Sequence, residues 1–215
     1  MNVYIREPIN GLTHLIGAIL SFVGLLAMVI KASMTTPSPL TIAAVIIFGI
    51  SMILLYSASA TYHMVIAKDK VIAFLRRLDH SMIFILIAGT YTPFCFISLN
   101  GKTGAILFSI ISGIAVCGVV FKMVWFHSPR WISTALYIAM GWMIVFVFSP
   151  LAGSLNPTGL FLLVLGGVFY TIGGVIYGIK PKFLKFKHWG FHEIFHIFIM
   201  LGSLAHFLTV FLYVI

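Results

Sequence analysis

Two histidines spaced four residues apart, His192 and His196, are the pair in this sequence best suited to bind a metal ion. In a helix, side chains at positions i and i+4 project from one face about 6 Å apart, so both imidazoles can bind the same cation. Two histidines alone make a weak site, because an open zinc site usually has three protein ligands and leaves a fourth position to water. A third ligand must therefore come from elsewhere in the chain.

His63 is the candidate third ligand, because it stands near the end of an apolar segment at the same expected membrane depth as the pair. Ser59 lies one helical turn before it on the same face, and Asp79 lies near the start of the next apolar segment. A hydroxyl there can reach water or a lipid carbonyl, and a carboxylate can orient water or accept its proton. The sequence predicts that His63, His192 and His196 bind Zn²⁺, with Asp79 and Ser59 as catalytic residues.

These residues also have structural interpretations, which the sequence leaves open. A histidine near a helix end is often only an interfacial side chain. Ser59 can donate a hydrogen bond to the carbonyl of Leu55. Asp79 can cap a helix or pair with Arg76 or Arg77.

Other assignments of the ligands are also open. The string His192-Glu193-Ile194-Phe195-His196 matches H-E-x-x-H, in which two histidines bind zinc and the glutamate is the base of a metalloprotease. Glu193 is rotated from the histidines and can instead face the basic loop at Lys185 and Lys187. His80 is an alternative ligand, and His14 has the right depth to lie beside the site.

The elements that position these residues are predicted to be membrane-spanning helices. Of the 215 residues, 61% are hydrophobic and 8% are charged, whereas a soluble domain carries about 25% charged residues. A spanning helix needs about 20 apolar residues. The predicted fold class is an all-α bundle of seven transmembrane helices, forming one domain over residues 1–215, with apolar stretches at Leu12–Ile30, Leu40–Ile66, Ser81–Leu99, Gly104–Val124, Trp131–Phe148, Gly159–Ile179 and His192–Ile215.

The distribution of basic residues predicts the orientation. Of 13 Lys and Arg residues, all but Lys31 and Lys102 fall on the side that holds the N-terminus, which leaves eleven there. Such a bias places the N-terminus in the cytoplasm and the C-terminus outside. Between the second and third spans, Val71, Phe74, Leu75 and Leu78 recur at helical spacing and predict a short helix in the interface.

Composition and charge also limit the classes of binding partner to be expected. The net charge of +9 does not indicate nucleic-acid binding, because no basic stripe with interleaved aromatic residues lies outside the apolar segments. Membrane lipids are the expected partners. Gly174 and Gly178, in the sixth span, predict close approach of a neighbouring helix.

The chain resembles the bacterial haemolysin III family, a branch of the progestin and adipoQ receptor superfamily. The resemblance rests on the order and spacing of Glu7-x-x-Asn10-x-x-x-His14, Ser59-x-x-x-His63, Arg77-Leu78-Asp79, Ala88-Gly89-Thr90-Tyr91-Thr92-Pro93 and His192-x-x-x-His196. It implies a zinc ion held by His63, His192 and His196 near the cytoplasmic face, with Asp79 holding the reacting water. The wider superfamily includes alkaline ceramidases, which implies amide hydrolysis on a lipid. The long cytoplasmic N-terminal domain of the animal receptors is absent, so receptor signalling of that kind is not expected.

Three functional hypotheses follow. The first is a zinc-dependent hydrolase of lipid amides or esters in the bacterial plasma membrane, with a role in lipid homeostasis. The second is a non-catalytic membrane sensor or receptor in which zinc ties two helices together. The third is a pore-forming cytolysin, which is poorly supported because the helices show no repeated polar stripe to line a channel.

Overall fold

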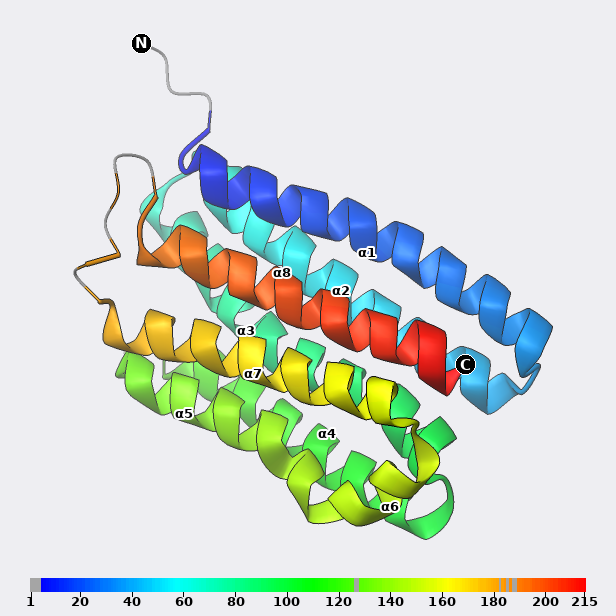
Figure 1. Ribbon diagram of the computed structural model, residues 1–215. Helices are drawn as coiled ribbons and strands as arrows, with labels where there is room; N and C mark the ends of the chain where they lie inside the picture. Colours follow the sequence, from blue (N-terminus) through cyan, green and yellow to red (C-terminus); the bar gives the residue numbers. More distant parts are fainter. Residues whose placement is uncertain (1–4, 126–127, 182, 185, 187–188) are drawn as a thin grey trace.

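Seven roughly parallel helical spans form the protein in a computed structural model that describes residues 5–125, 128–181, 183–184, 186 and 189–215 (Figure 1). All regular secondary structure in these ranges is helical, which confirms the predicted fold class. The elements are α1 (Pro8–Thr35), α2 (Pro39–Met64), α3 (Asp69–Pro93), η1 (Phe94–Leu99), α4 (Gly101–Val124), α5 (Arg130–Gly141), η2 (Trp142–Val147), α6 (Phe148–Ser154), α7 (Pro157–Ile179), α8 (Phe191–Thr209) and η3 (Val210–Val214).

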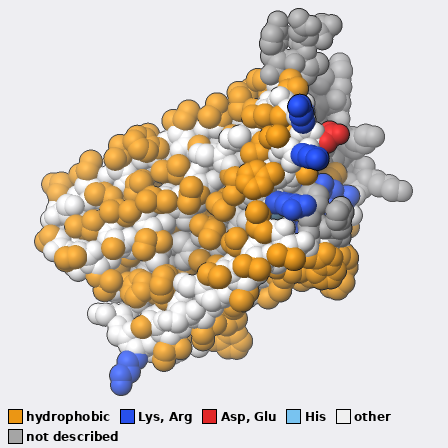
Figure 2. Space-filling view, turned by 180° about the vertical axis from the view of Figure 1, so that it is seen from behind, with side chains coloured by type: hydrophobic (Ala, Val, Ile, Leu, Met, Phe, Trp, Pro, Cys, Tyr) orange, Lys and Arg blue, Asp and Glu red, His pale blue; other side chains and the backbone are white. Residues whose placement is uncertain are grey.

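The two ends of the bundle differ in charge. We call the end at which α1, α3, α5 and α8 begin the N-terminal end; the C-terminus lies at the opposite end (Figure 1). Figure 2 shows basic side chains gathered at one end, while hydrophobic side chains cover the long sides. Three of the eleven basic residues assigned to the N-terminal side lie outside the described residues, namely Lys182, Lys185 and Lys187. Which end faces the cytoplasm stays a prediction from the charge bias.

The third span corrects one expectation from the sequence. The separate interfacial helix predicted around Val71 and Phe74 does not exist, because α3 runs without interruption from Asp69 to Pro93. The chain has no glycine or proline between Asp69 and Gly89, so nothing stops the helical hydrogen bonding there. Asp79 therefore lies ten residues inside α3 rather than at its start.

Prolines and one tyrosine explain the irregular parts of the third and fifth spans. Pro93 has no N–H, and the hydroxyl of Thr92 donates to the carbonyl of Gly89 that this leaves free. In the fifth span, the 3₁₀ helix η2 joins α5 to α6. Pro150, in α6, has no backbone N–H to donate to the preceding turn. The hydroxyl of Tyr91 crosses to this break, donating to the carbonyl of Gly141 at 2.7 Å and accepting from the N–H of Ile144 at 2.9 Å.

The contacts at Gly174 and Gly178 in the sixth span are at ordinary van der Waals distance, so the unusually close approach predicted there is not found. A Cβ atom at Gly174 would meet Ile138 and Thr134 at 3.5 Å, and one at Gly178 would meet Thr134 at 3.6 Å. The helices α5 and α7 lie against each other at these positions. Together the two helices form one side of the cavity described below.

Candidate metal centre

The three histidines predicted to bind metal lie together at the N-terminal end of the bundle. His63 stands in the last turn of α2, and His192 and His196 stand in the first two turns of α8. One ligand nitrogen from each lies within 4.8 Å of the others. His63 and His196 are buried, each with 1% of the residue exposed, and His192 is partly buried.

One pair of ring nitrogens in the cluster has the spacing that a tetrahedral zinc ion requires. Two nitrogens bound to one such ion at about 2.0–2.1 Å are about 3.3 Å apart. The Nε2 atoms of His63 and His192 are 3.3 Å apart. The ring of His196 is buried, and its centroid lies 5.0 Å from that of His63 and 4.6 Å from that of His192. The donor set therefore suits Zn²⁺, which favours imidazole ligands.

A carboxylate orients one of the three rings. Nδ1 of His63 donates to Oε2 of Glu7 at 2.7 Å. When His63 is neutral, this bond places its proton on Nδ1 and leaves Nε2 available to a metal, an arrangement common around zinc histidines. The hydrogen bond from His63 and the nearby charges of His63 and Arg6 lower the pKa of Glu7 to about 2, although partial burial acts in the opposite direction.

The same carboxylate belongs to a network that joins the start of α1 to the start of α8. The side-chain amide of Asn10 donates to Oε1 of Glu193 at 2.9 Å and to Oε2 of Glu7 at 3.3 Å. Oε2 of Glu193 accepts the N–H of Gly190 at 2.7 Å, which caps α8. Glu193 thus has a structural role. It is not placed to act as the general base that the metalloprotease interpretation requires. Lys185 and Lys187, its other suggested partners, lie outside the described residues.

Glu7 and Asn10 are not among the functional residues predicted from the sequence. The signal was present in the motif Glu7-x-x-Asn10-x-x-x-His14, whose spacing places three polar side chains on one face of α1. What the sequence does not show is that the start of α1 lies against the end of α2. The backbone N–H of Glu7 donates to the carbonyl of His63 at 2.9 Å.

Asp79 and Ser59, predicted to be catalytic, adjoin each other beside the cluster. Both are buried, with 8% and 1% exposed. The hydroxyl of Ser59 lies within hydrogen-bonding reach of the Asp79 carboxyl group, and His63 interacts with this carboxyl group electrostatically. Both residues line the large cavity below the histidines.

The two other nearby histidines have different surroundings. His14 is buried against the cluster, and neither of its nitrogens has a partner among the described residues. His80, the alternative ligand, lies outside the group of three, and its Nε2 is 3.2 Å from the hydroxyl of Tyr177. The arrangement therefore favours His63 over His80 as the third ligand.

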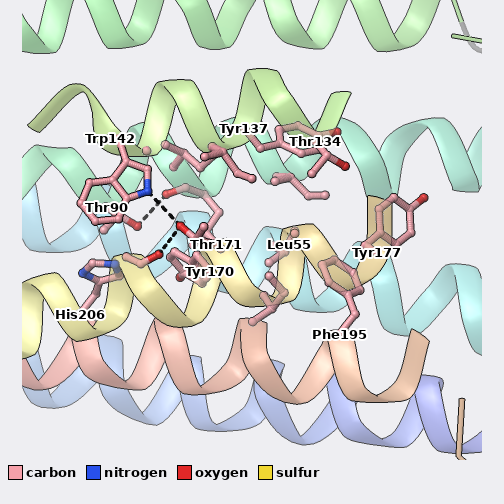
Figure 3. Close-up of a pocket in the computed structure, with 18 of the residues that line it drawn as sticks. Leu55, Thr90, Thr134, Tyr137, Trp142, Tyr170, Thr171, Tyr177, Phe195 and His206 are labelled. Carbon is pink, nitrogen blue, oxygen red and sulfur yellow. Dashed lines mark hydrogen bonds between the residues drawn. The ribbon is translucent and has the colours of Figure 1, made fainter. Parts of the chain in front are cut away.

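A cavity of about 500 Å³ extends from the histidines into the bundle. Figure 3 shows Tyr177 and Phe195 toward one end of it and Trp142, Thr90 and His206 toward the other. Most of its wall is apolar, and the indole N–H of Trp142 is satisfied by Thr171 at 2.9 Å. Three of its lining residues also face the outside of the bundle, because they are substantially exposed: Val145 (53%), Phe148 (42%) and Val164 (39%).

Comparison with known proteins gives consistent matches over the whole chain. A family model described as haemolysin-III related matches residues 2–207. The chain is 40% identical to "Hemolysin-3" of Bacillus cereus over 218 residues, covering 100% of this chain and 95% of the relative. It is 39% identical to a "Hemolysin-3 homolog" of Bacillus subtilis (strain 168), covering 97% and 95%. An ADIPOR-like receptor of Saccharomyces cerevisiae is 30% identical over 166 residues, covering 69% of this chain and 52% of that protein.

Proposed function

The chain belongs to the haemolysin-III-related family and is a multi-pass bacterial membrane protein, and on this premise we propose that it is a zinc-dependent hydrolase of lipid amides or esters. The observation that carries the proposal is a cluster of three imidazoles, two of which, those of His192 and His196, line one end of a mainly apolar cavity of about 500 Å³. The apolar wall suits an acyl chain, and the histidines suit a metal that acts on the polar group at its end. The proposed role is in membrane lipid homeostasis.

Each residue in and around the cluster has a separate role in the proposed reaction. His63, His192 and His196 hold the zinc ion, which when bound acts as a Lewis acid and makes water nucleophilic near neutral pH. Asp79 accepts a proton from the water as its oxygen bonds to the acyl carbon. It returns that proton to the leaving nitrogen or oxygen as the acyl bond breaks. Ser59 positions the water or the carbonyl group, and the products are a fatty acid and an amine or alcohol.

The test is a direct assay of lipid cleavage. Zinc-loaded protein in nanodiscs is offered ceramides, other acyl amides and acyl esters, and released fatty acid is measured by mass spectrometry. We expect release from at least one class by the wild type and none by Asp79→Asn. A broad panel with no release above the level of this variant would overturn the proposal.

A second candidate, a sensor or receptor with structural zinc, is favoured by one observation. All three ligands come from α2 and α8, so a bound ion would tie two helices that are far apart in the sequence. Metal-dependent stability without any cleavage of the lipid panel would favour this candidate. The names of the Bacillus relatives raise a third candidate, lysis of membranes, which dye release from liposomes tests in the same preparation.

A further inference from the structure

The cavity that begins at the metal centre ends among a second group of polar side chains. On α8, His196 and His206 both line it and are ten positions apart, which is about 15 Å along a helix. On α3, Asp79 and Thr90 line it eleven positions apart, about 16 Å and on the same face. Figure 3 shows Thr90, Trp142 and His206 toward one end of the cavity. The α3 wall is apolar in its middle, where it is formed by Ile83, Leu86 and Ile87.

His206 is the most unusual member of this second group. It lies inside the seventh span, with only 6% of the residue exposed. Its Nδ1 atom has no hydrogen-bond partner among the described residues, and its ring lies against that of Tyr170, with 5.2 Å between the ring centroids. Buried polar atoms normally have a partner. An ionisable residue within a membrane span usually faces a functional site, because its burial is costly.

The packing of α7 on α8 makes room for this imidazole. A Cβ atom at Gly166 of α7 would lie 2.8 Å from both Cε1 and Nε2 of His206. Any larger residue at this position would therefore force the ring to move. The glycine allows the imidazole to stand at the cavity wall.

The neighbouring polar groups have already used their protons. The hydroxyl of Thr90 donates to the carbonyl of Leu86 at 2.8 Å, and its oxygen can still accept a hydrogen bond. Thr171 already accepts the indole N–H of Trp142. A neutral imidazole has one donor and one acceptor. A ligand group at this end therefore meets an acceptor on Thr90 and both kinds of partner on His206.

A neutral hydroxyl group suits these partners better than a charged group. Neither lysine nor arginine is among the described residues that line the cavity, so a carboxylate or phosphate would be buried here without a countercharge. Asp79, the acidic residue in the described lining, lies toward the metal centre, so an ammonium group would also lack compensation. A carbonyl oxygen only accepts, whereas a hydroxyl can donate to Thr90 and accept from His206.

We propose that His206 and Thr90 form a subsite for a hydroxyl group on the hydrocarbon chain of a bound lipid. An extended chain advances about 1.25 Å per bond, so the separation of about 15 Å between the two ends corresponds to about 12 bonds. The ligand class is an acyl chain with a hydroxyl group about 12 carbons from the acyl carbon. The inference rests on the proposed function in one respect, which is that the acyl carbon lies at the metal centre.

The experiment measures binding rather than cleavage. Stearic acid, 12-hydroxystearic acid and 2-hydroxystearic acid each displace a fluorescent fatty acid from the protein in nanodiscs. The preference is the ratio of the dissociation constants of stearic acid and a hydroxy acid. Because each acid partitions into the same lipid whichever variant is present, a change in this ratio between variants reports the site. His206→Leu removes the imidazole, and His206→Gln is the matched control that keeps a donor and an acceptor.

The preference for 12-hydroxystearic acid should be about 2- to 10-fold greater in the wild type than in His206→Leu, as expected for a hydrogen bond in a buried site. His206→Gln should retain part of it. The preference for 2-hydroxystearic acid should be the same in all variants, because its hydroxyl lies at the metal end. If His206→Leu does not fold, Thr90→Val takes its place.

Equal preference for 12-hydroxystearic acid in the wild type and the variant overturns the inference, as does the absence of displacement by any acid. A loss as complete in His206→Gln as in His206→Leu also overturns it, because the ring would then act only by its shape. Lipid cleavage without this preference would overturn the subsite and leave the hydrolase proposal intact. The preference without cleavage would do the reverse.

Discussion

The imidazole of His14 stacks on that of His196, with 3.6 Å between the ring centroids and 12° between the ring planes. This stacking lets the flat ring of His14 hold the ring of His196 in place. We predict that His14→Phe keeps most of the zinc, whereas His14→Ala loses it several-fold, measured by elemental analysis. Equal loss in both variants would show that a nitrogen of His14 is required.

The metal ligands are tested by removal. His63→Ala, His192→Ala and His196→Ala should each lose most of the bound zinc and unfold at lower temperature, because metal that binds only the folded state stabilises it. His80→Ala is the matched control, since it removes a neighbouring histidine outside the cluster and should retain one zinc per chain. One zinc per chain in the double variant of His192 and His196 would place the site elsewhere.

Glu7 should tune the metal without binding it. Glu7→Gln removes the charge that fixes the tautomer of His63 and should weaken zinc binding roughly 10- to 100-fold. Asp69→Asn, at the exposed start of α3, is the control and should leave affinity unchanged. Competition with a chelator of known affinity measures the difference.

Glu7 also predicts a pH dependence of the metal-free protein. Its pKa is lowered from 4.5 to about 2, so its stabilising effect is complete above pH 4.5 and is lost as the pH falls toward 2. The difference in unfolding temperature between wild type and Glu7→Gln should therefore be constant above that window and shrink within it. A difference that persists unchanged at the bottom of the window would rule out the carboxylate as its source.

Substitutions of Asp79 and Ser59 should affect lipid cleavage more than zinc binding. Asp79→Asn should retain most of the zinc and lose lipid cleavage, because the amide cannot accept the proton of water. Ser59→Ala should have an intermediate effect on cleavage, and His63→Ala should lose both zinc and cleavage. Zinc content and fatty-acid release are measured on the same samples. Full cleavage by Asp79→Asn would exclude Asp79 as the base.

The orientation can be tested independently of the site. Eleven basic residues against two predict a cytoplasmic N-terminus, so a reporter fused after Ile215 should be active only if it functions outside the cytoplasm. A C-terminal reporter active only in the cytoplasm would reverse the bundle and place the histidine cluster at the outer face.

The sequence predicted the seven spans and the three clustered histidines for identifiable reasons. Apolar runs of spanning length leave few alternatives, and the i, i+4 spacing of His192 and His196 fixes their common face. The bond between Glu7 and His63 was not predictable, because it joins residues 56 positions apart and depends on how α1 lies against α2. The extent of α3 was misjudged because charged and apolar residues alternate in its first turns, as in an interfacial helix.

Val145, Phe148 and Val164 face the cavity and the outside of the bundle at once, and this changes how occupancy of the cavity should be expressed. An apolar molecule reaches such a wall by diffusing in two dimensions within the bilayer, without passing through water. The relevant variable is then its mole fraction among the surrounding lipids rather than its molar concentration in the sample. Adding inert lipid to the nanodiscs should lower occupancy even when the total amounts of protein and ligand are unchanged.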